Sequence, residues 1–341
     1  MSASPSTDAL STEPCNEWHV CALYCFAELP DCAAWRDRLR ALCEREALRG
    51  TLLLACEGIN GTVAGPRGGI DALLRELAGD QRFAGAEIKH ARADAPPFRR
   101  LKVRCKPEIV TLGRAVDVPR DRGRHVAPAD WNAVVADPAV TLIDARNDFE
   151  VGLGTFEGAL DPRTRDFGDF PAWAAANLPA ERDAPVAMFC TGGIRCEKAT
   201  AWLAGRGYRN LLQLHGGILA YLEQVPEAET KWRGACFVFD ERVAVGHGLE
   251  PTDHTVCRSC RMPLSATDRT HEDHDAEISC PHCAASLRPE DRARRVERRE
   301  QEARARARGT THIAADLDAE RARKRAERRA QRERSLGKQP G

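Results

Sequence analysis

The sequence lacks the features of a secreted or a membrane-spanning protein. Its first residues, MSASPSTDALSTEP, are polar and contain no apolar signal-peptide core. The chain also has no apolar run of about 18 residues, the length needed to cross a bilayer. We therefore expect a cytoplasmic protein without membrane contacts, whose 14 cysteines are reduced, bound to metal or catalytic.

Net charge and internal repeats are absent as well. Lys and Arg number 51, and so do Asp and Glu, yet these charges are spread unevenly. From residue 284 to the end there are 18 basic and 10 acidic residues, a net charge of +8, which leaves −8 for residues 1–283. The neutral total therefore hides a basic C-terminal tail. A chain of 341 residues is long enough for two or three domains.

After a polar N-terminus at residues 1–16, which we expect to be disordered, the patterns predict an α+β module over residues 17–115. VCALYCF is typical of a strand, and CAAWRDRLRALCERE predicts a helix with one apolar face formed by Trp35, Leu39, Leu42 and Cys43. TLLLACEGINGTVAG predicts two strands around a turn that contains Gly58, Asn60 and Gly61. A second helix and the strand EIKHA complete the order strand, helix, strand, strand, helix, strand, which is that of a ferredoxin-like unit.

The segment LKVRCK alternates apolar and basic side chains, so that the basic ones share one face of a strand. This pattern is typical of a strand with a solvated face. It would also suit a basic stripe that binds phosphates, and two arginines just before the strand favour that alternative. The candidate phosphate-binding residues are Arg99, Arg100, Lys102, Arg104 and Lys106.

Residues 125–225 predict a small α/β domain with a parallel sheet. VTLIDA, VAMFC and LLQL are short and almost entirely apolar, as strands are when helices cover both faces of a sheet. Between the last two strands the pattern predicts a helix that ends at Gly205 and Gly207 and has one face formed by Cys196, Ala199, Thr200 and Leu203.

The stretch CTGGIR, between the strand VAMF and this helix, raises the question whether Cys190 is a packed core thiol or a nucleophile. Adjacent glycines let successive N–H groups turn towards the sulfur, and the helix start and an arginine add positive charge. Such surroundings lower the pKa of a cysteine from about 8.5 to roughly 3.5–7.5. We therefore predict that Cys190 is catalytic, as a thiolate or a persulfide, in an anion cradle formed by Thr191, Gly192, Gly193, Ile194 and Arg195.

Cys196 lies six residues further on and has two alternative roles. It could resolve a disulfide with Cys190, or its place on the apolar face of the helix could make it a core residue.

Residues 226–290 are rich in Cys and His and have little periodicity. CRSC and CPHC give the pattern C-x2-C-x19-C-x2-C, which is typical of a structural zinc site with the four ligands Cys257, Cys260, Cys280 and Cys283. Two thiol pairs without metal are the alternative. Residues 291–341 form an Arg-rich tail with few apolar residues, which favours a solvated helix or disorder and leaves RNA contact open.

CTGGIRCEKATAWL resembles the active-site loop of rhodanese-type sulfurtransferase domains. LIDARNDFEVGLGTFEGAL resembles their upstream signature, with Asp144, Arg146, Glu150 and Gly158. In that family the first loop cysteine carries a persulfide, and this position corresponds to Cys190. The six-residue loop is one residue shorter than in rhodanese-like phosphatases, which implies sulfur chemistry.

Seven blocks in fixed order, from LYCFAELPD to CFVFDERVAVGHGL, are similar to the bacterial oxygen-dependent tRNA uridine(34) hydroxylases over about residues 19–285. The resemblance implies an acylphosphatase-like, ferredoxin-like module before a rhodanese domain. It also implies an oxidoreductase of the monooxygenase type that converts wobble uridine to 5-hydroxyuridine, with Cys190 as the catalytic cysteine. Molecular oxygen would be the co-substrate, the electron donor is unknown, and the partner would be the tRNA anticodon arm and not DNA.

Two other functions stay open. One is a persulfide sulfurtransferase that delivers sulfur to tRNA or to a small acceptor. The other is a zinc-containing RNA-binding protein with an inactive rhodanese domain, against which the intact Cys190 and Arg195 argue. The sequence has no recognisable flavin or iron motif, so Cys190 could add to C6 of uracil or cycle through oxidised sulfur states.

Overall fold

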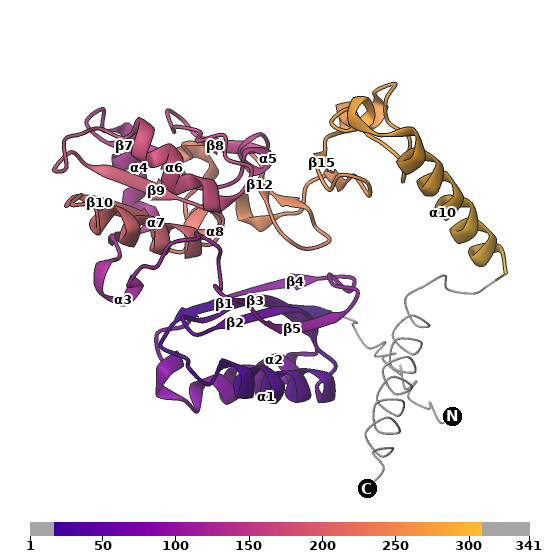
Figure 1. Ribbon diagram of the computed structural model, residues 1–341, viewed down its shortest axis with the longest axis horizontal. Coiled ribbons are helices and arrows are strands. Elements are labelled where there is room, and N and C mark those ends of the chain that lie inside the picture. The colour runs from indigo at the N-terminus through magenta and orange to yellow at the C-terminus, as the bar shows by residue number, and fades with distance from the viewer. Residues whose placement is uncertain (1–16, 309–341) are drawn as a thin grey trace, which may run out of the picture. The chain divides into compact units, whose positions relative to one another are not determined.

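The computed structural model describes residues 17–308, which divide after His254 into two compact units (Figure 1). The first unit holds an N-terminal domain and an α/β domain, and the second holds the remaining Cys-rich segment and a long helix. The predicted disorder of residues 1–16 and the predicted tail beyond residue 308 lie outside the described residues.

The N-terminal domain is a five-stranded sheet with two helices on one face (Figure 1). Its elements are β1 (Trp18–Phe26), α1 (Cys32–Arg45), β2 (Arg49–Ala55), β3 (Gly58–Gly65), α2 (Arg67–Ala78), β4 (Glu87–Ala93) and β5 (Leu101–Cys105). The strands lie in the order β4-β1-β3-β2-β5, and all neighbours are antiparallel except β2 and β5. The predicted ferredoxin-like order is therefore confirmed, and β5 adds a fifth strand at one edge.

The predicted apolar face of α1 is buried in the core of this domain, with Trp35, Leu39, Leu42 and Cys43 at most 5% exposed. The predicted turn at Gly58, Asn60 and Gly61 is wrong, because these residues lie in β3 and the chain turns at Cys56 and Glu57. A side chain at Gly58 or Gly61 would overlap the backbone of the neighbouring strand. These glycines therefore permit close strand pairing rather than a turn.

The α/β domain is built on a parallel sheet, as the sequence predicts, but a fourth strand, β6 (Arg124–Val126), joins the three predicted ones. Its elements are α3 (Val118–Asp121), β6 (Arg124–Val126), α4 (Pro128–Ala136), β7 (Thr141–Asp144), α5 (Asp148–Val151), β8 (Gly154–Phe156), α6 (Phe170–Asn177), β9 (Val186–Phe189), α7 (Ile194–Ala204), β10 (Leu211–Leu214) and α8 (Gly217–Gln224). The sheet order is β6-β10-β9-β7. Residues of α4 and α8 pack in one hydrophobic cluster and those of α6 and α7 in another, so every residue of β9 and β10 is buried.

Residues 226–254, which the sequence groups with the Cys-rich segment, pack with the α/β domain. β11 (Trp232–Gly234) pairs with β8, and a short hairpin follows, formed by β12 (Cys236–Phe237) and β13 (Ala244–Val245). Trp232, Cys236 and Val245 belong to the same buried cluster as Phe189 of β9. The structural division therefore lies after His254 and not after residue 225.

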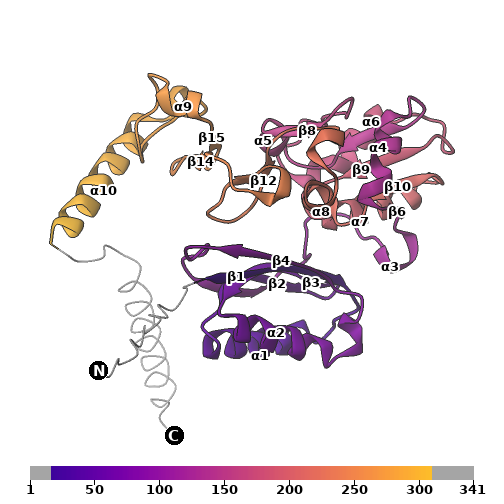
Figure 2. The same ribbon diagram turned by 180° about the vertical axis from the view of Figure 1, so that it is seen from behind.

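The second unit contains two very short strands and a helix of 19 residues (Figure 2). Its elements are β14 (Thr255–Val256), β15 (Pro263–Leu264), α9 (Ala266–Thr270) and α10 (Pro289–Ala307). Most Arg and Glu side chains of α10 are exposed or only partly covered. Of the two states predicted for the tail, the solvated helix is therefore the one found up to Ala307.

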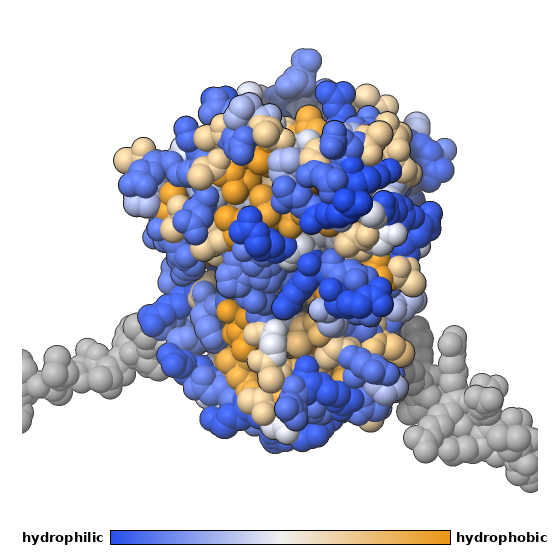
Figure 3. Space-filling view, turned by 90° about the vertical axis from the view of Figure 1, so that its left-hand side faces the viewer, coloured by the Kyte–Doolittle hydropathy of each residue, from blue (hydrophilic) through white to orange (hydrophobic). Residues whose placement is uncertain are grey.

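Few large apolar side chains are exposed in residues 17–308. Among the described residues these are Ile88, Leu160 and Phe239. On the face in Figure 3, apolar side chains lie in separate groups among polar ones. Within the same range, no helix combines the length and the apolar character needed to cross a membrane.

Candidate functional site

Cys190 directly follows β9, at the carboxyl end of the parallel strands, and a short loop connects it to α7. Its Sγ accepts a hydrogen bond of 3.2 Å from the N–H of Gly193. Gly193 has a φ of +102°, a conformation that glycine adopts without strain. The side chain of Cys190 is completely buried. The loop thus presents backbone N–H to a sulfur shielded from solvent.

The surroundings of Cys190 favour its thiolate. Burial raises the pKa of this thiol, but hydrogen bonding by the Cys196 thiol and the positive charge of Arg195 outweigh burial, and backbone N–H groups add to them. The net result is a pKa of about 5. Burial and the neighbouring Cys190 raise the pKa of Cys196 instead, so this residue keeps its proton. Its placement, buried and within hydrogen-bonding reach of Cys190, suits both of its predicted roles.

A chain of buried ion pairs supports the loop. The guanidinium of Arg195 donates to both oxygens of Glu150 at 2.5 and 2.8 Å. Arg146 donates to both oxygens of Asp144 at 2.8 and 2.6 Å, and to the backbone carbonyl of Glu150 at 3.2 Å. Burial raises the pKa of the Glu150 carboxyl, but Arg195 outweighs burial and lowers it. Three residues of the upstream signature therefore act together behind the loop, whereas Gly158 lies outside this chain of ion pairs.

The start of α8 holds the loop from a second side. The N–H groups of Ile218 and Leu219 donate to the carbonyl oxygens of Cys190 and Thr191 at 3.0 and 3.1 Å. A Cβ atom at Gly217 would lie 2.5 Å from the carbonyl oxygen of Cys190. Glycine at position 217 is therefore required for α8 to approach the loop this closely.

Two side chains of the N-terminal domain reach the loop and were not predicted. Lys89 of β4 donates to the carbonyl oxygen of Gly192 at 3.4 Å and also to that of Gly216. The hydroxyl of Tyr24 in β1 donates to Glu197 of α7 at 3.5 Å and lies beside Gly193. Strand alternation places both on the sheet face opposite α1 and α2, but alternation does not reveal what covers that face.

A buried lysine also joins the two domains. Lys198 of α7 is 1% exposed, and its ammonium donates to Glu57 at 2.9 Å and to Glu108 at 2.5 Å. Burial raises the pKa of the Glu108 carboxyl, and the hydrogen bond from Lys198 is the main factor that lowers it below its ordinary value. These ion pairs connect the helix after the Cys190 loop to the N-terminal domain.

The predicted basic stripe lies away from Cys190. It is carried by β5, at the edge of the sheet opposite β4. Arg99, Arg100, Arg104 and Lys106 are exposed, whereas Lys102 is half-buried. Lys102 and Arg104 point to the same sheet face as Lys89, because Val103 between them is buried on the side of the helices.

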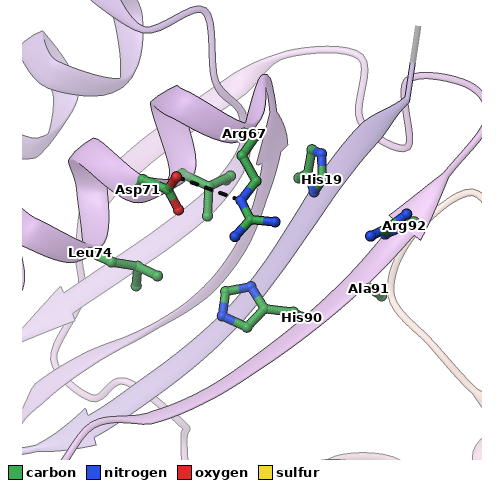
Figure 4. A pocket seen from close by; sticks show the side chains of 8 residues that line it. His19, Arg67, Asp71, Leu74, His90, Ala91 and Arg92 are labelled. Atoms are coloured by element: carbon green, nitrogen blue, oxygen red, sulfur yellow. Dashed lines mark ion pairs between the residues drawn. The ribbon is translucent and has the colours of Figure 1, made fainter. Parts of the chain in front are cut away.

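A groove of about 370 Å³ lies on the other face of this sheet, beside α2 (Figure 4). In Figure 4 the side chain of Arg67 extends over the strands that carry His19 and His90. Arg67 pairs with Asp71 at 3.6 Å, and Arg92 pairs with Glu17 at 2.8 Å. Neither the Cys190 loop nor the basic stripe lines this groove.

The four cysteines predicted as zinc ligands come together in the second unit. The ligand atoms of Cys257, Cys260, Cys280 and Cys283 all lie within 4.8 Å of one another. The Sγ of Cys280 is 3.6 Å from that of Cys260 and 3.8 Å from that of Cys283. A tetrahedral ion with zinc–sulfur bonds of about 2.3 Å requires sulfurs about 3.8 Å apart. The donor set and its spacing therefore fit zinc.

The N-terminal domain matches a known protein family. Residues 18–109 match the family described as UPF0176 acylphosphatase like domain. Two solved structures overlap the chain: the rhodanese-like domain of the Alr3790 protein from Anabaena sp. and a rhodanese-related protein from Thermoplasma volcanium. The first is 20% identical and covers 32% of this chain and 78% of its own, with a TM-score of 0.26. The second is 24% identical and covers 30% of this chain and 93% of its own, also with a TM-score of 0.26.

Relatives in sequence extend over most of the chain. A protein of Jannaschia sp. (strain CCS1) named tRNA uridine(34) hydroxylase is 52% identical over 86% of this chain and 98% of the relative. A protein of the same name from Brucella abortus (strain 2308) is 48% identical over 91% of this chain and 98% of the relative. With this identity over nearly the whole length of its relatives, the chain belongs to the tRNA uridine(34) hydroxylase family.

Proposed function

We propose that the protein hydroxylates C5 of uridine 34 in tRNA and that Cys190 is its reacting group. The observation that carries the proposal is the buried Cys190 sulfur, held by backbone N–H groups and Arg195 with a pKa of about 5. A thiolate at neutral pH is a strong nucleophile. The names of the relatives supply the substrate, and the site supplies a group that can attack it.

The reaction we propose consumes uridine, molecular oxygen, two electrons and two protons, and yields 5-hydroxyuridine and water. An electron donor outside the chain supplies the two electrons. Two routes are open to the thiolate of Cys190. It can add to C6 of uracil, which moves an electron pair towards C5 and makes C5 nucleophilic, and leave again once C5 carries oxygen and has lost its proton. Alternatively, the sulfur itself can be oxidised and reduced in each turnover.

The wobble base belongs to the single-stranded anticodon loop and can be splayed out at low cost. Because Cys190 is completely buried, the base reaches the sulfur only if a covering side chain moves. Tyr24, whose hydroxyl lies beside Gly193, is our candidate for that movement. We assign the basic stripe to contacts with tRNA phosphates, with Arg99, Arg100, Arg104 and Lys106 exposed for this purpose. The cytoplasmic location belongs to the same proposal.

The proposal also includes a structural zinc ion held by Cys257, Cys260, Cys280 and Cys283. An ion with four sulfur ligands has no open position for a substrate, so its contribution is folding free energy. Among residues 255–308, the second unit has one small buried hydrophobic cluster, formed by Cys257, Leu264, Cys280 and Cys283. Zinc would therefore take the place of a larger hydrophobic core.

A persulfide sulfurtransferase is the second candidate. The observation in its favour is the loop itself, since a cradle of N–H groups around Cys190 would equally hold the outer sulfur of a persulfide. Both candidates use Cys190, but they leave different products in tRNA.

The test is the nucleoside content of tRNA from a strain that lacks the gene, measured by mass spectrometry. Complementation with the wild-type gene or with Cys56→Ser, an exposed cysteine outside the loop, should restore 5-hydroxyuridine and its derivatives. Complementation with Cys190→Ser should not. Loss of a thiolated nucleoside with hydroxylation intact would replace the first candidate by the second.

A further inference from the structure

We propose that Lys89 of the N-terminal domain is a positioning residue of the Cys190 site, which holds the Gly192–Gly193 peptide with its N–H towards the sulfur. The inference builds on the proposed function, since it concerns the residue assigned there as the reacting group. It adds a residue 103 positions upstream of Gly192, from a different domain.

Three successive carbonyl oxygens of the loop accept hydrogen bonds from outside it. The carbonyl oxygens of Cys190 and Thr191 accept hydrogen bonds from backbone N–H groups at the start of α8. The third carbonyl oxygen, that of Gly192, accepts a hydrogen bond of 3.4 Å from the ammonium of Lys89. In a trans peptide the carbonyl and the N–H point in opposite directions. Holding the Gly192 carbonyl outward therefore keeps the N–H of the same peptide, that of Gly193, turned inward towards the sulfur.

The third peptide is the one that needs a fixed partner most. Its N–H belongs to Gly193 and donates to the Cys190 sulfur at 3.2 Å. Neither Gly192 nor Gly193 has a Cβ atom, so steric hindrance opposes rotation of this peptide only weakly. A rotated peptide would point the Gly192 carbonyl oxygen at the thiolate, where the two negative partners repel. A hydrogen bond from a charged donor to that oxygen opposes the rotation.

Lys89 also ties the loop to α8. Its ammonium donates to the carbonyl oxygen of Gly216, directly before the helix that holds Cys190 and Thr191. Gly216 and Gly217 both have left-handed φ values, +69° and +66°, which let the chain pass this close to the lysine. One side chain thus holds both segments around the sulfur.

Charged and titratable groups surround both Lys89 and the Cys190 thiol. Burial lowers the pKa of Lys89, and Cys190, Glu87, Cys236 and Glu223 oppose this shift. The Cys190 thiol itself faces Cys196 and Arg195 of α7 and Tyr24 of β1. Removal of Lys89 therefore leaves Arg195 in place, so that the effect of the lysine can be measured separately.

The experiment measures the ionisation of Cys190 in the full-length protein. The ultraviolet absorbance of the thiolate is followed against pH, and each protein is compared with its own Cys190→Ser counterpart, so that the other cysteines cancel. The variants are Lys89→Met, which removes the charge and the donor, and Lys89→Arg, which keeps both. The matched control is Lys231→Met, an exposed lysine of the same unit.

We expect a midpoint near pH 5 for the wild type and for Lys231→Met. In Lys89→Met the midpoint should rise by about one pH unit or more, which corresponds to the loss of a hydrogen bond to a charged group. Lys89→Arg should have a midpoint close to that of the wild type. An unchanged midpoint in Lys89→Met would overturn the proposal. If this variant does not fold, as judged by circular dichroism, the neutral Lys89→Gln takes its place under the same criterion. Because the readout needs no tRNA, it can fail or succeed independently of the hydroxylation assay.

Discussion

Arg195 and Glu150 form a completely or almost completely buried ion pair, joined by hydrogen bonds of 2.5 and 2.8 Å. This pair fixes the position of a positive charge that lowers the pKa of Cys190. Glu150 lies between two arginines, because Arg195 binds its carboxylate and Arg146 donates a hydrogen bond to its backbone carbonyl. The stability of the loop and the reactivity of its cysteine therefore depend on the same residues.

The substitution Glu150→Gln should destabilise the protein strongly. It leaves the buried guanidinium of Arg195 without its carboxylate, and breaking a buried ion pair in this way costs about 3–5 kcal/mol. The free energy of unfolding is measured by urea denaturation. The control is Glu157→Gln, whose ion pair with Arg233 is exposed and should contribute about 1 kcal/mol or less. Equal effects of the two substitutions would contradict the role given to Glu150.

Gly193→Ala should damage the loop, whereas Gly192→Ala should be tolerated. At Gly193 the φ of +102° is strained for alanine, and the new Cβ atom would lie 3.1 Å from the Tyr24 hydroxyl. At Gly192 a Cβ atom would meet nothing within 4 Å. We expect Gly193→Ala to lower the hydroxylation rate by about tenfold to a hundredfold, the effect of losing a hydrogen bond to a charged group. Similar rates for both variants would show that the cradle does not depend on this N–H.

The pH dependence of the reaction should follow the thiolate of Cys190. Because its pKa is lowered to about 5, the thiolate is present above this pH, and activity should be lost as the pH falls through about 5. Below the midpoint the rate should drop about tenfold per pH unit. Initial rates over the acidic range measure this profile. A midpoint near the ordinary value for cysteine, about 8.5, would mean that the surroundings do not stabilise the anion.

Zinc content should depend on the two cysteine pairs of the second unit. The purified protein should contain about one zinc ion per chain, and the double variant Cys257→Ser/Cys280→Ser should contain almost none, because each pair loses a ligand. Elemental analysis after dialysis measures this. Cys56→Ser, an exposed thiol outside the cluster, is the control and should keep the metal. Unchanged zinc in the double variant would exclude the site.

Local patterns predicted the architecture and the backbone of the site well. Spacing along α1 identified its buried face, and the apolar runs identified β9 and β10 as covered strands. The stretch CTGGIR indicated a loop whose N–H groups turn to the sulfur, as Gly193 does. These features depend on residues close together in the sequence, where periodicity and glycine content carry the information.

What could not be predicted depends on contacts between distant segments. Lys89 looks like an ordinary strand residue, and its role near the loop follows only from the packing of two domains. The glycines of β3 suggested a turn because the same residue type permits both turns and close strand pairing. Residues 226–254 lack periodicity, so their place in the α/β core, through Trp232 and Cys236, was not evident.

The source of the oxygen atom tests the central claim most directly. A strain lacking the gene is complemented with the wild-type gene or with Cys190→Ser and grown under isotopically labelled dioxygen, and its tRNA nucleosides are analysed by mass spectrometry. We predict that 5-hydroxyuridine derivatives from the wild-type complement carry the labelled oxygen and that they are missing with Cys190→Ser. Unlabelled 5-hydroxyuridine, or its full presence with Cys190→Ser, would contradict the account.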